Sequence, residues 1–385
     1  MNELDQKLLA IIQDGFPLVE RPYKALAETL NVSEQKVFDA VEMLRVSGVI
    51  RRIGGVYDSK KLGFISRLCA GKVPTSPQDF STESHDETAM EKFAAVVMDE
   101  PAITHNYIRS HEYNVWFTVI AENEAAIETV VERVCAKTKL HDVHALSATK
   151  KYKINTVMSL DERRGSAGSP TLTKDEIGES APALRHSEIQ VPRHSETCAL
   201  RHSDNRRLEE SSNFLGKLTD SDKFRIHIAC DDIPHTLTPF KDWGVSCDEL
   251  REDIDAKRMR RFGAILRHQN AGFAFNAMVC FNIDERRVIL SDEAAKDPVK
   301  SYDLIAQAGS LLASNPHISH CYERPSFDGF PYNVYAMMHA NSAEQLDQFI
   351  ADCVKALNAL QSSPVDYVVL RSVRELKKTS FKFFA

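Results

Sequence analysis

The chain has 385 residues, 43% of them hydrophobic, so it is too long for one ordinary domain and can bury two or more cores. Its 48 basic and 55 acidic side chains give a net charge of −7, which argues against a protein built mainly to neutralise nucleic-acid phosphates. No apolar run approaches the roughly 20 residues that a membrane-spanning helix needs, and the N-terminus lacks the pattern of an export signal. We therefore expect a cytoplasmic protein.

The eight cysteines are scattered, without a C-x-x-C pair that would indicate a zinc or iron–sulfur site. We interpret most of them as reduced, small apolar side chains.

Residues 1–60 have the pattern of a winged helix-turn-helix. Apolar residues recur at helical spacing over residues 3–13, Pro22 suits the first turn of a second helix, and Ser33 suits the N-cap of a third. A strand-like run over residues 49–57 would form the wing. Such a domain usually reads DNA with its third helix.

The predicted third helix is poorly suited to reading DNA. It offers three acidic and two basic side chains, namely Glu34, Asp39, Glu42, Lys36 and Arg45. Groove entry calls for clustered basic and amide side chains. We therefore expect a packing module, with DNA binding unlikely.

Residues 61–160 change to the order strand, helix, two strands, helix, strand. The strands are predicted at residues 65–73, in a hairpin over residues 103–121, and at residues 142–157; the helices are predicted at residues 87–98 and 123–137. This order predicts a ferredoxin-like βαββαβ domain with helices on one face of a sheet. The fold class is therefore α+β.

Residues 161–214 interrupt this pattern with a polar segment. It repeats Arg-His-Ser-acid from Arg185, Arg193 and Arg201, and three histidines in such a segment could in principle bind a metal. Few large apolar residues are present to offset the entropy of ordering. The sequence therefore favours a disordered linker.

A second unit follows the linker. Residues 215–268 preserve a reduced winged helix-turn-helix with a shortened connecting helix, and residues 269–385 repeat the ferredoxin-like pattern. Its strands are predicted at residues 275–283, in a second hairpin and at residues 365–370, with helices at residues 303–314 and 343–360.

Two motifs show that the chain is one unit written twice. His-x-Tyr-x-Arg begins at His105 and again at His320, a displacement of 215 positions, and Tyr-Asn-Val-aromatic follows in both copies. An Arg-Arg-x-Gly motif places Arg52 and Arg261 209 positions apart. Two motifs in the same order at nearly the same offset indicate an internal repeat.

Each unit concentrates arginine and histidine on segments that the fold should bring to one face of the sheet. In the first unit these are Arg51, Arg52, His105, Arg109, His111, Lys150 and Lys151; in the second they are Arg260, Arg261, Arg267, His268, His320, Arg324 and Arg374. The neighbouring aromatic residues are Tyr107, Tyr113, Tyr322, Phe327 and Tyr332. Arginines that clamp carboxylates, with aromatic rings and a histidine that moves a proton or binds metal, fit a flat ligand with several carboxylates.

Simpler roles remain open for single residues. A lone arginine on a wing is usually solvated, and a lone histidine is more often a satisfied side chain than a ligand. Gly54 and Gly263 would only permit a bulge, and Asn114 and Asn333 could equally fix a turn by bonding backbone.

The recurring segments 50–64 and 260–273, with Ser-His-Cys-Tyr-Glu-Arg-Pro and Pro-Tyr-Asn-Val-Tyr, resemble the siroheme decarboxylase family, whose architecture is similar to that of Lrp/AsnC regulators. The resemblance covers nearly everything except the linker, and the chain looks like two related subunits fused head to tail. It implies conversion of siroheme to 12,18-didecarboxysiroheme on the routes to haem d1 or haem. One departure is that Ile108 and Ser110 stand where the second copy has Glu323 and Pro325.

The resemblance suggests roles for the site residues. Loss of carbon dioxide from a pyrrole acetate needs an acid beside the ring, for which we expect His105, with His320 as its counterpart or as an axial ligand of the substrate iron. Arg52, Arg109, Arg261, Arg324, Lys150 and Lys151 would hold the other carboxylates. No redox cofactor is needed for the net change, and the siroheme iron is a part of the substrate.

The sequence leaves two other functions open: a ligand-sensing transcription regulator and a non-catalytic tetrapyrrole carrier. We expect the fused units to fold as an intramolecular pseudo-dimer, which could form a further homo-oligomer.

Overall fold

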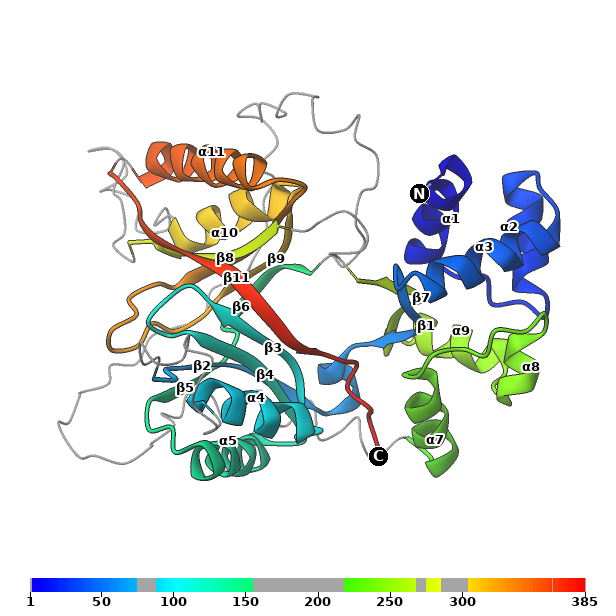
Figure 1. The fold of residues 1–385 in the computed structure, drawn as a ribbon, viewed down its shortest axis with the longest axis horizontal. Coiled ribbons are helices and arrows are strands. Elements are labelled where there is room, and N and C mark those ends of the chain that lie inside the picture. Colours follow the sequence, from blue (N-terminus) through cyan, green and yellow to red (C-terminus); the bar gives the residue numbers. More distant parts are fainter. Residues whose placement is uncertain are drawn as a thin grey trace, which may run out of the picture.

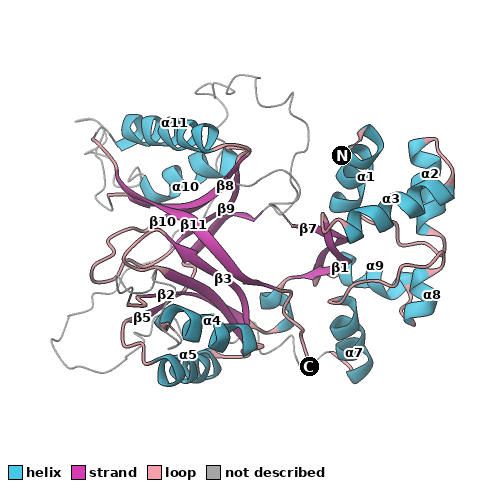
Figure 2. Ribbon diagram, in the orientation of Figure 1, coloured by secondary structure: helices cyan, strands magenta, loops and turns pink. Residues whose placement is uncertain are grey.

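The structure, a computed structural model, describes residues 2–74, 88–154, 218–267, 275–284, 304–361 and 363–384. It confirms the predicted α+β fold class with two helix-turn-helix segments and a sheet domain (Figures 1 and 2). The predicted linker and its histidine repeats lie outside the described residues, as does His268. No helix in the described part of the chain combines the length and the apolar composition that a bilayer crossing requires.

Each unit begins with three helices and a wing strand. The first unit has α1 (Glu3–Asp14), α2 (Pro22–Leu30), α3 (Glu34–Val46) and β1 (Ile50–Tyr57), followed by the 3-10 helix η1 (Ser59–Leu62). The second has α7 (Asp220–Ala229), α8 (Pro239–Trp243), α9 (Cys247–Asp255) and β7 (Met259–Leu266). The prediction of Ser33 as an N-cap is confirmed, since its side chain accepts the backbone N–H of Lys36. The predicted shortening of the connecting helix is confirmed by the five residues of α8.

The two units exchange their first helices across the wing. Strands β1 and β7 pair antiparallel as a two-stranded ribbon, α1 of the first unit packs on β7, and α7 of the second unit packs on β1. A Cβ atom at Gly54 would lie 2.3 Å from the carbonyl oxygen of Asp231, and one at Gly263 would lie 2.6 Å from that of Ile12. The recurring glycine therefore allows each wing strand to approach the helix of the other unit closely.

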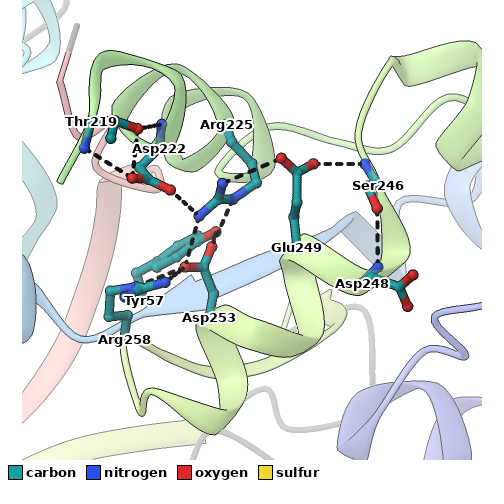
Figure 3. A network of polar contacts seen from close by, with 9 residues as sticks. All are labelled: Tyr57, Thr219, Asp222, Arg225, Ser246, Asp248, Glu249, Asp253 and Arg258. Carbon is teal, nitrogen blue, oxygen red and sulfur yellow. Dashed lines mark hydrogen bonds and ion pairs between the residues drawn. The ribbon is translucent and has the colours of Figure 1, made fainter.

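The helices of the second unit enclose a charged network (Figure 3). Asp253 in α9 is fully buried and accepts hydrogen bonds from Arg225 of α7, from Arg258, and from the Tyr57 hydroxyl at 2.9 Å. Because Tyr57 ends the wing strand of the first unit, this network also joins the two units.

The ferredoxin-like halves form one nine-stranded antiparallel sheet in the order β5-β2-β4-β3-β11-β8-β10-β9-β6. Its first-unit elements are β2 (Ile65–Gly71), α4 (Ala89–Asp99), β3 (Ile103–Arg109), β4 (Val115–Ala121), α5 (Glu124–Thr138), β5 (Val143–Leu146) and β6 (Lys150–Ile154). Its second-unit elements are β8 (Phe275–Asn282), α10 (Leu304–Ser314), β9 (Ile318–Glu323), β10 (Val334–Ala340), α11 (Ala343–Gln361) and β11 (Asp366–Lys378).

The closing strands differ from the sequence prediction. The single strand expected over residues 142–157 is two strands: β5 pairs with β2 of its own unit, and β6 pairs with β9 of the second unit. The last strand, expected over residues 365–370, continues to Lys378, and its second half pairs with β3 of the first unit. The prediction was wrong because strand exchange is set by pairing between distant segments, which local periodicity does not report.

The sheet has helices on its outer face and a separate core on its inner face. Helices α4 and α5 cover the first half and α10 and α11 the second (Figure 1). The inner core includes Trp116, Cys280, Tyr335 and Leu370 from both halves. The edge strands β5 and β6 are joined by residues 147–149 alone, so the curled sheet brings its two edges together around this inner core.

Candidate functional site

The first His-x-Tyr-x-Arg motif places its three side chains on the inner face of the sheet. In β3, His105 is paired with Thr118 and Tyr107 with Trp116, which belongs to the inner core, whereas the intervening Asn106 is paired with Phe117 of the outer core. Residues two apart in a strand point to the same face. The motif is therefore a stripe of side chains along one face.

The second motif forms the equivalent stripe on β9. His320 is paired with Met337 and Tyr322 with Tyr335, both from the inner core, while Cys321 faces the outer core. The structure thus brings both copies of the motif to the same inner face, as the sequence predicted.

The arginines of the two stripes bond across the unit boundary. Arg109 Nη1 donates to the carbonyl oxygen of Leu370 at 2.9 Å, and Arg324 Nη1 donates to that of Leu146 at 2.9 Å. The guanidinium groups also lie over Tyr107 and Tyr322, with 5.0 Å and 4.9 Å between the guanidinium carbon and the ring centroid. Among the described residues, the Nε atom of each arginine is buried and has no hydrogen-bond partner.

Burial shapes the charge of these arginines. It lowers the pKa of Arg109 to about 10 and also lowers the pKa of Arg324, because a low-dielectric interior disfavours the charged form. Arg109 therefore remains cationic near neutral pH. A carboxylate of a bound ligand would restore the interactions that burial removes.

The histidines of the two stripes have matching partners. The Nδ1 atom of His105 lies 2.9 Å from the hydroxyl oxygen of Thr104, and that of His320 lies 2.9 Å from the hydroxyl oxygen of Ser319. A hydrogen bond at Nδ1 fixes the orientation of an imidazole ring. These hydroxyl groups were missed in the sequence, although both directly precede the recurring histidine.

The wing supplies one further arginine to each stripe. Arg51 Nη2 donates to the Ser380 hydroxyl at 3.3 Å; burial lowers its pKa, and the charges of Glu375 and Tyr107 oppose this effect. Arg260 bonds Asp58 at 3.0 Å, and its charge influences the pKa of Tyr322. The ribbon thus presents a cation to the tyrosine of each stripe.

We name two groups of side chains by this arrangement. The first-unit cluster is Arg51, His105, Tyr107, Arg109 and Glu375; the second-unit cluster is Arg260, His320, Tyr322, Arg324 and Lys151. Glu375 was not among the predicted site residues because it stands in a charged C-terminal segment that gave no motif.

The second arginine of each wing motif bonds the helix exchanged from the other unit. Arg52 Nη1 donates to the carbonyl oxygen of Asp231 at 3.4 Å, just past the end of α7, and Arg261 Nη1 donates to that of Gln13, near the end of α1. Burial lowers the pKa of Arg52 to about 10 and lowers the pKa of Arg261. Cations at helix C-termini are stabilising. The predicted roles of both arginines toward substrate stay predictions.

The two lysines of β6 lie on opposite faces of the sheet. Lys151 is paired with Tyr322 on the inner face, whereas Lys150 is paired with Glu323 and lies over the ring of Tyr152, which packs on the outer core. Arg374 of β11 is likewise paired with Ile108 on the outer side. The expectation that these residues share one face was wrong because strand residues alternate. Arg267 is exposed and follows β7 directly.

Three other predicted substrate-binding residues belong to an aromatic cluster at the far ends of the hairpins. Tyr113 contacts Phe327 at 4.9 Å between ring centroids, His111 contacts Phe330 at 5.5 Å, and Tyr332 contacts Phe330 at 4.8 Å. The hairpin ends are remote from Thr104, which bonds Thr379 next to the wing contact Ser380. The structure therefore separates these residues from His105, and their binding role stays a prediction.

The two recurring asparagines hold the backbone of a neighbouring segment, which is the simpler role that the sequence left open for them. Asn114 exchanges hydrogen bonds of 2.8 Å with both backbone groups of Val73, and Asn333 does the same for Ile283 at 2.9 and 2.8 Å. Among the residues that the structure describes, no three metal-ligating side chains gather at one place. The seven cysteines in this part of the chain are free thiols.

Two helix-turn-helix segments attached to a shared sheet define a fused pair of AsnC-like ligand-binding units. Comparison with protein families agrees: the siroheme decarboxylase NirDL-like HTH domain matches residues 5–51, and the AsnC-like ligand binding domain matches residues 81–153 and 299–377. A siroheme decarboxylase alpha subunit of Desulfovibrio desulfuricans is 39% identical over 161 residues, covering 42% of this chain and 86% of that protein. The chain belongs to the siroheme decarboxylase family.

Two further relatives span the whole chain. The siroheme decarboxylase of Hydrogenobacter thermophilus is 28% identical over 393 residues, covering all of this chain and 96% of that protein. The crystal structure of the siroheme decarboxylase NirDL superposes with a TM-score of 0.59 at 24% identity, covering all of this chain and 95% of that one. The latter likeness supports the fold of the fused pair.

Proposed function

We propose that the chain is a carboxy-lyase that removes two acetate carboxylates of siroheme to give 12,18-didecarboxysiroheme. The observation that carries the proposal is the pair of His-Tyr-Arg stripes on one inner sheet face, each with a wing arginine. Cations beside aromatic rings suit a flat ligand with several carboxylates. Family membership supplies the identity of that ligand.

The reaction replaces a carboxylate by a proton. The bond between the acetate methylene carbon and the carboxylate carbon breaks, its electron pair stays with the macrocycle, and carbon dioxide leaves. One proton then completes the methyl group, so no electron acceptor is consumed. In this proposal no resident cofactor takes part, and the iron is a part of the substrate.

His105 is the proton donor in this mechanism. A histidine can carry a proton near neutral pH and pass it to a nearby carbon. The contact between its Nδ1 atom and Thr104 at 2.9 Å would hold the ring in place during transfer. His320, held by Ser319 in the same way, is its counterpart or an axial ligand of the substrate iron.

The cations hold the carboxylates that are not lost. Arg109 and Arg324 stand on the inner face, and Arg51, Arg260 and Lys151 approach the two tyrosines. Desolvated guanidinium groups bind carboxylates more strongly than exposed ones do, because water competes less. This arrangement fits one acidic ring gripped from several sides.

The test is anaerobic incubation of the protein with siroheme, followed by mass spectrometry of the tetrapyrrole. We expect loss of two carbon dioxide units with wild type and a fall of about 100-fold or more in turnover with His105→Ala. His141→Ala, at an exposed histidine before β5, is the matched control. Unchanged turnover in both His105→Ala and His320→Ala would remove the histidine assignment, whereas intact siroheme with wild type would support a carrier instead.

The structure gives little support to a DNA-reading function. Of the two basic residues in α3, Arg45 is engaged by Asp232 at 3.0 Å, and Phe38 of the same helix is stacked on His235 at 3.9 Å between ring centroids. A regulator would bind duplex DNA with a steep salt dependence. The cytoplasmic location, the receiving pathway and any further oligomer stay predictions.

A further inference from the structure

The two clusters carry opposite charges at one pair of equivalent positions. Glu375 is paired with Tyr107 across strands, and Lys151 is paired with Tyr322. The two residues are 224 positions apart, as are Leu370 and Leu146, whose carbonyl oxygens accept the equivalent bonds from Arg109 and Arg324. The internal repeat therefore relates Glu375 to Lys151.

Glu375 influences both neighbours within the first-unit cluster. Burial raises the pKa of Tyr107, and the charge and hydrogen bonding of Glu375 raise it further. The same carboxylate also favours the charged form of Arg51. A negative charge therefore stands on the sheet side of this cluster, facing a cation on the wing.

The second-unit cluster has the reverse arrangement. Its carboxylate is that of Asp58, at the wing. Asp58 accepts a hydrogen bond from Arg260 at 3.0 Å, and the charge of Lys151 favours its ionised form. Its sheet side carries Lys151 beside Tyr322. The sheet side of this cluster therefore attracts a carboxylate, whereas Glu375 on the sheet side of the first-unit cluster repels one.

Resting on the proposed function, we propose that Glu375 makes the first-unit cluster the place where carbon dioxide leaves, while Lys151 makes the second-unit cluster the place where retained carboxylates are held. A ligand acetate beside Tyr107 lies next to another carboxylate. Repulsion between like charges raises the energy of this bound state, and loss of neutral carbon dioxide relieves it.

The step remains balanced with Glu375 in this position. The carbon–carbon bond to the carboxylate breaks, the electron pair passes to the macrocycle, His105 donates one proton to the methylene carbon, and carbon dioxide departs. Glu375 neither gains nor loses a bond. It acts on the reacting group only through its charge.

The experiment separates binding of siroheme from its turnover. Absorbance titration gives the dissociation constant, and single-turnover mass spectrometry gives the rate. With Glu375→Gln we expect a rate about tenfold lower, with siroheme bound equally well or more tightly, because a repulsion has been removed. Glu375→Lys, which copies the other cluster, should bind more tightly still and react more slowly, whereas Glu375→Asp should keep most of the rate.

Arg374→Gln is the matched control, because Arg374 is adjacent to Glu375 but lies on the opposite face of β11. There its charge favours the ionised form of Glu91 in α4. We expect its rate and binding to equal those of wild type. If wild type is active and the rate of Glu375→Gln lies within twofold of the wild-type rate, this inference is overturned and the proposed function still stands. Weaker binding in Glu375→Gln and Glu375→Asp together would also overturn it, since that pattern indicates a structural role. A wild type that leaves siroheme intact sinks the proposed function itself.

Discussion

The two helix-turn-helix segments bury different chemistry in the same shared core. The first segment fills it with apolar side chains, among them Leu8, Leu9, Ile12, Val41 and Leu44. The second places the fully buried Asp253 and the buried Arg225 beside its apolar residues. Two copies of one fold can therefore keep their topology while one replaces apolar contacts by a charged network.

The contacts between the units are more similar than the cores within them. Arg52 and Arg261 each bond the end of the exchanged helix, and Arg109 and Arg324 each bond a carbonyl group of the other unit. The recurring motifs therefore contain residues that make the contacts between the units as well as residues of the candidate site. Substitutions can test this contrast between divergent cores and matched contacts.

The largest effect should come from Asp253→Ala. The change leaves Arg225 and Arg258 buried or half-buried without their common acceptor, and breaking a buried ion pair from one side costs about 3–5 kcal/mol. Denaturant unfolding followed by circular dichroism gives the change in free energy of unfolding. Leu44→Ala, at the repeat-related position of the first segment, should cost about 2–5 kcal/mol through a cavity instead.

A triple variant sharpens this comparison. Replacing Asp253, Arg225 and Arg258 together by Leu, Met and Met gives the second segment the chemistry of the first. Apolar replacement of a whole buried ionic network is often neutral or stabilising. A triple variant less stable than Asp253→Ala would contradict this account of the network.

The matched interface arginines should give equal, intermediate effects. Arg109→Met and Arg324→Met each remove a charged hydrogen bond of 2.9 Å to a carbonyl group of the other unit. We expect each to lower the free energy of unfolding by about 1.5–3 kcal/mol. If the free-energy cost of one variant lies within this range and that of the other lies outside it, the two arginine contacts do not stabilise the protein equally.

The glycines of the wing should give a smaller effect. An added Cβ at Gly54 would lie 2.3 Å from a backbone oxygen, and one at Gly263 would lie 2.6 Å from another, so Gly54→Ala and Gly263→Ala should each cost about 1–3 kcal/mol. Gly15→Ala is the control, because nothing lies within 4 Å of its added Cβ. Thermal unfolding of the three variants measures the difference, and a cost at Gly15 equal to the others would argue against the close-approach explanation.

The sequence predicted what local patterns encode. The spacing of His105, Tyr107 and Arg109 was enough to predict a strand with one functional face, and Ser33 and Pro22 were enough to predict the starts of helices. The exchange of β6 between units was not predictable, because a strand's partner depends on tertiary packing. Asp253 was missed because an acidic residue in a short helix normally indicates a solvated face. Glu375 was missed because its place beside Tyr107 depends on the pairing of β11 with β3, which the sequence does not report.

The smallest expected effect is on stability in acid and concerns Asp222 in the first turn of α7. The Thr219 hydroxyl donates to Asp222 and, although burial opposes it, this bond together with the Thr219 N–H and Arg225 lowers the pKa of Asp222 from 3.8 to about 2. A folded-state pKa below the unfolded value contributes stability above about pH 4, and this contribution is lost as the pH falls toward about 2. We expect Asp222→Asn to be less stable than wild type at pH 7 and to lose this difference in acid, as urea midpoints across that range would show. A difference that persists at pH 2 would mean that Asp222 stabilises α7 by packing and not by its charge.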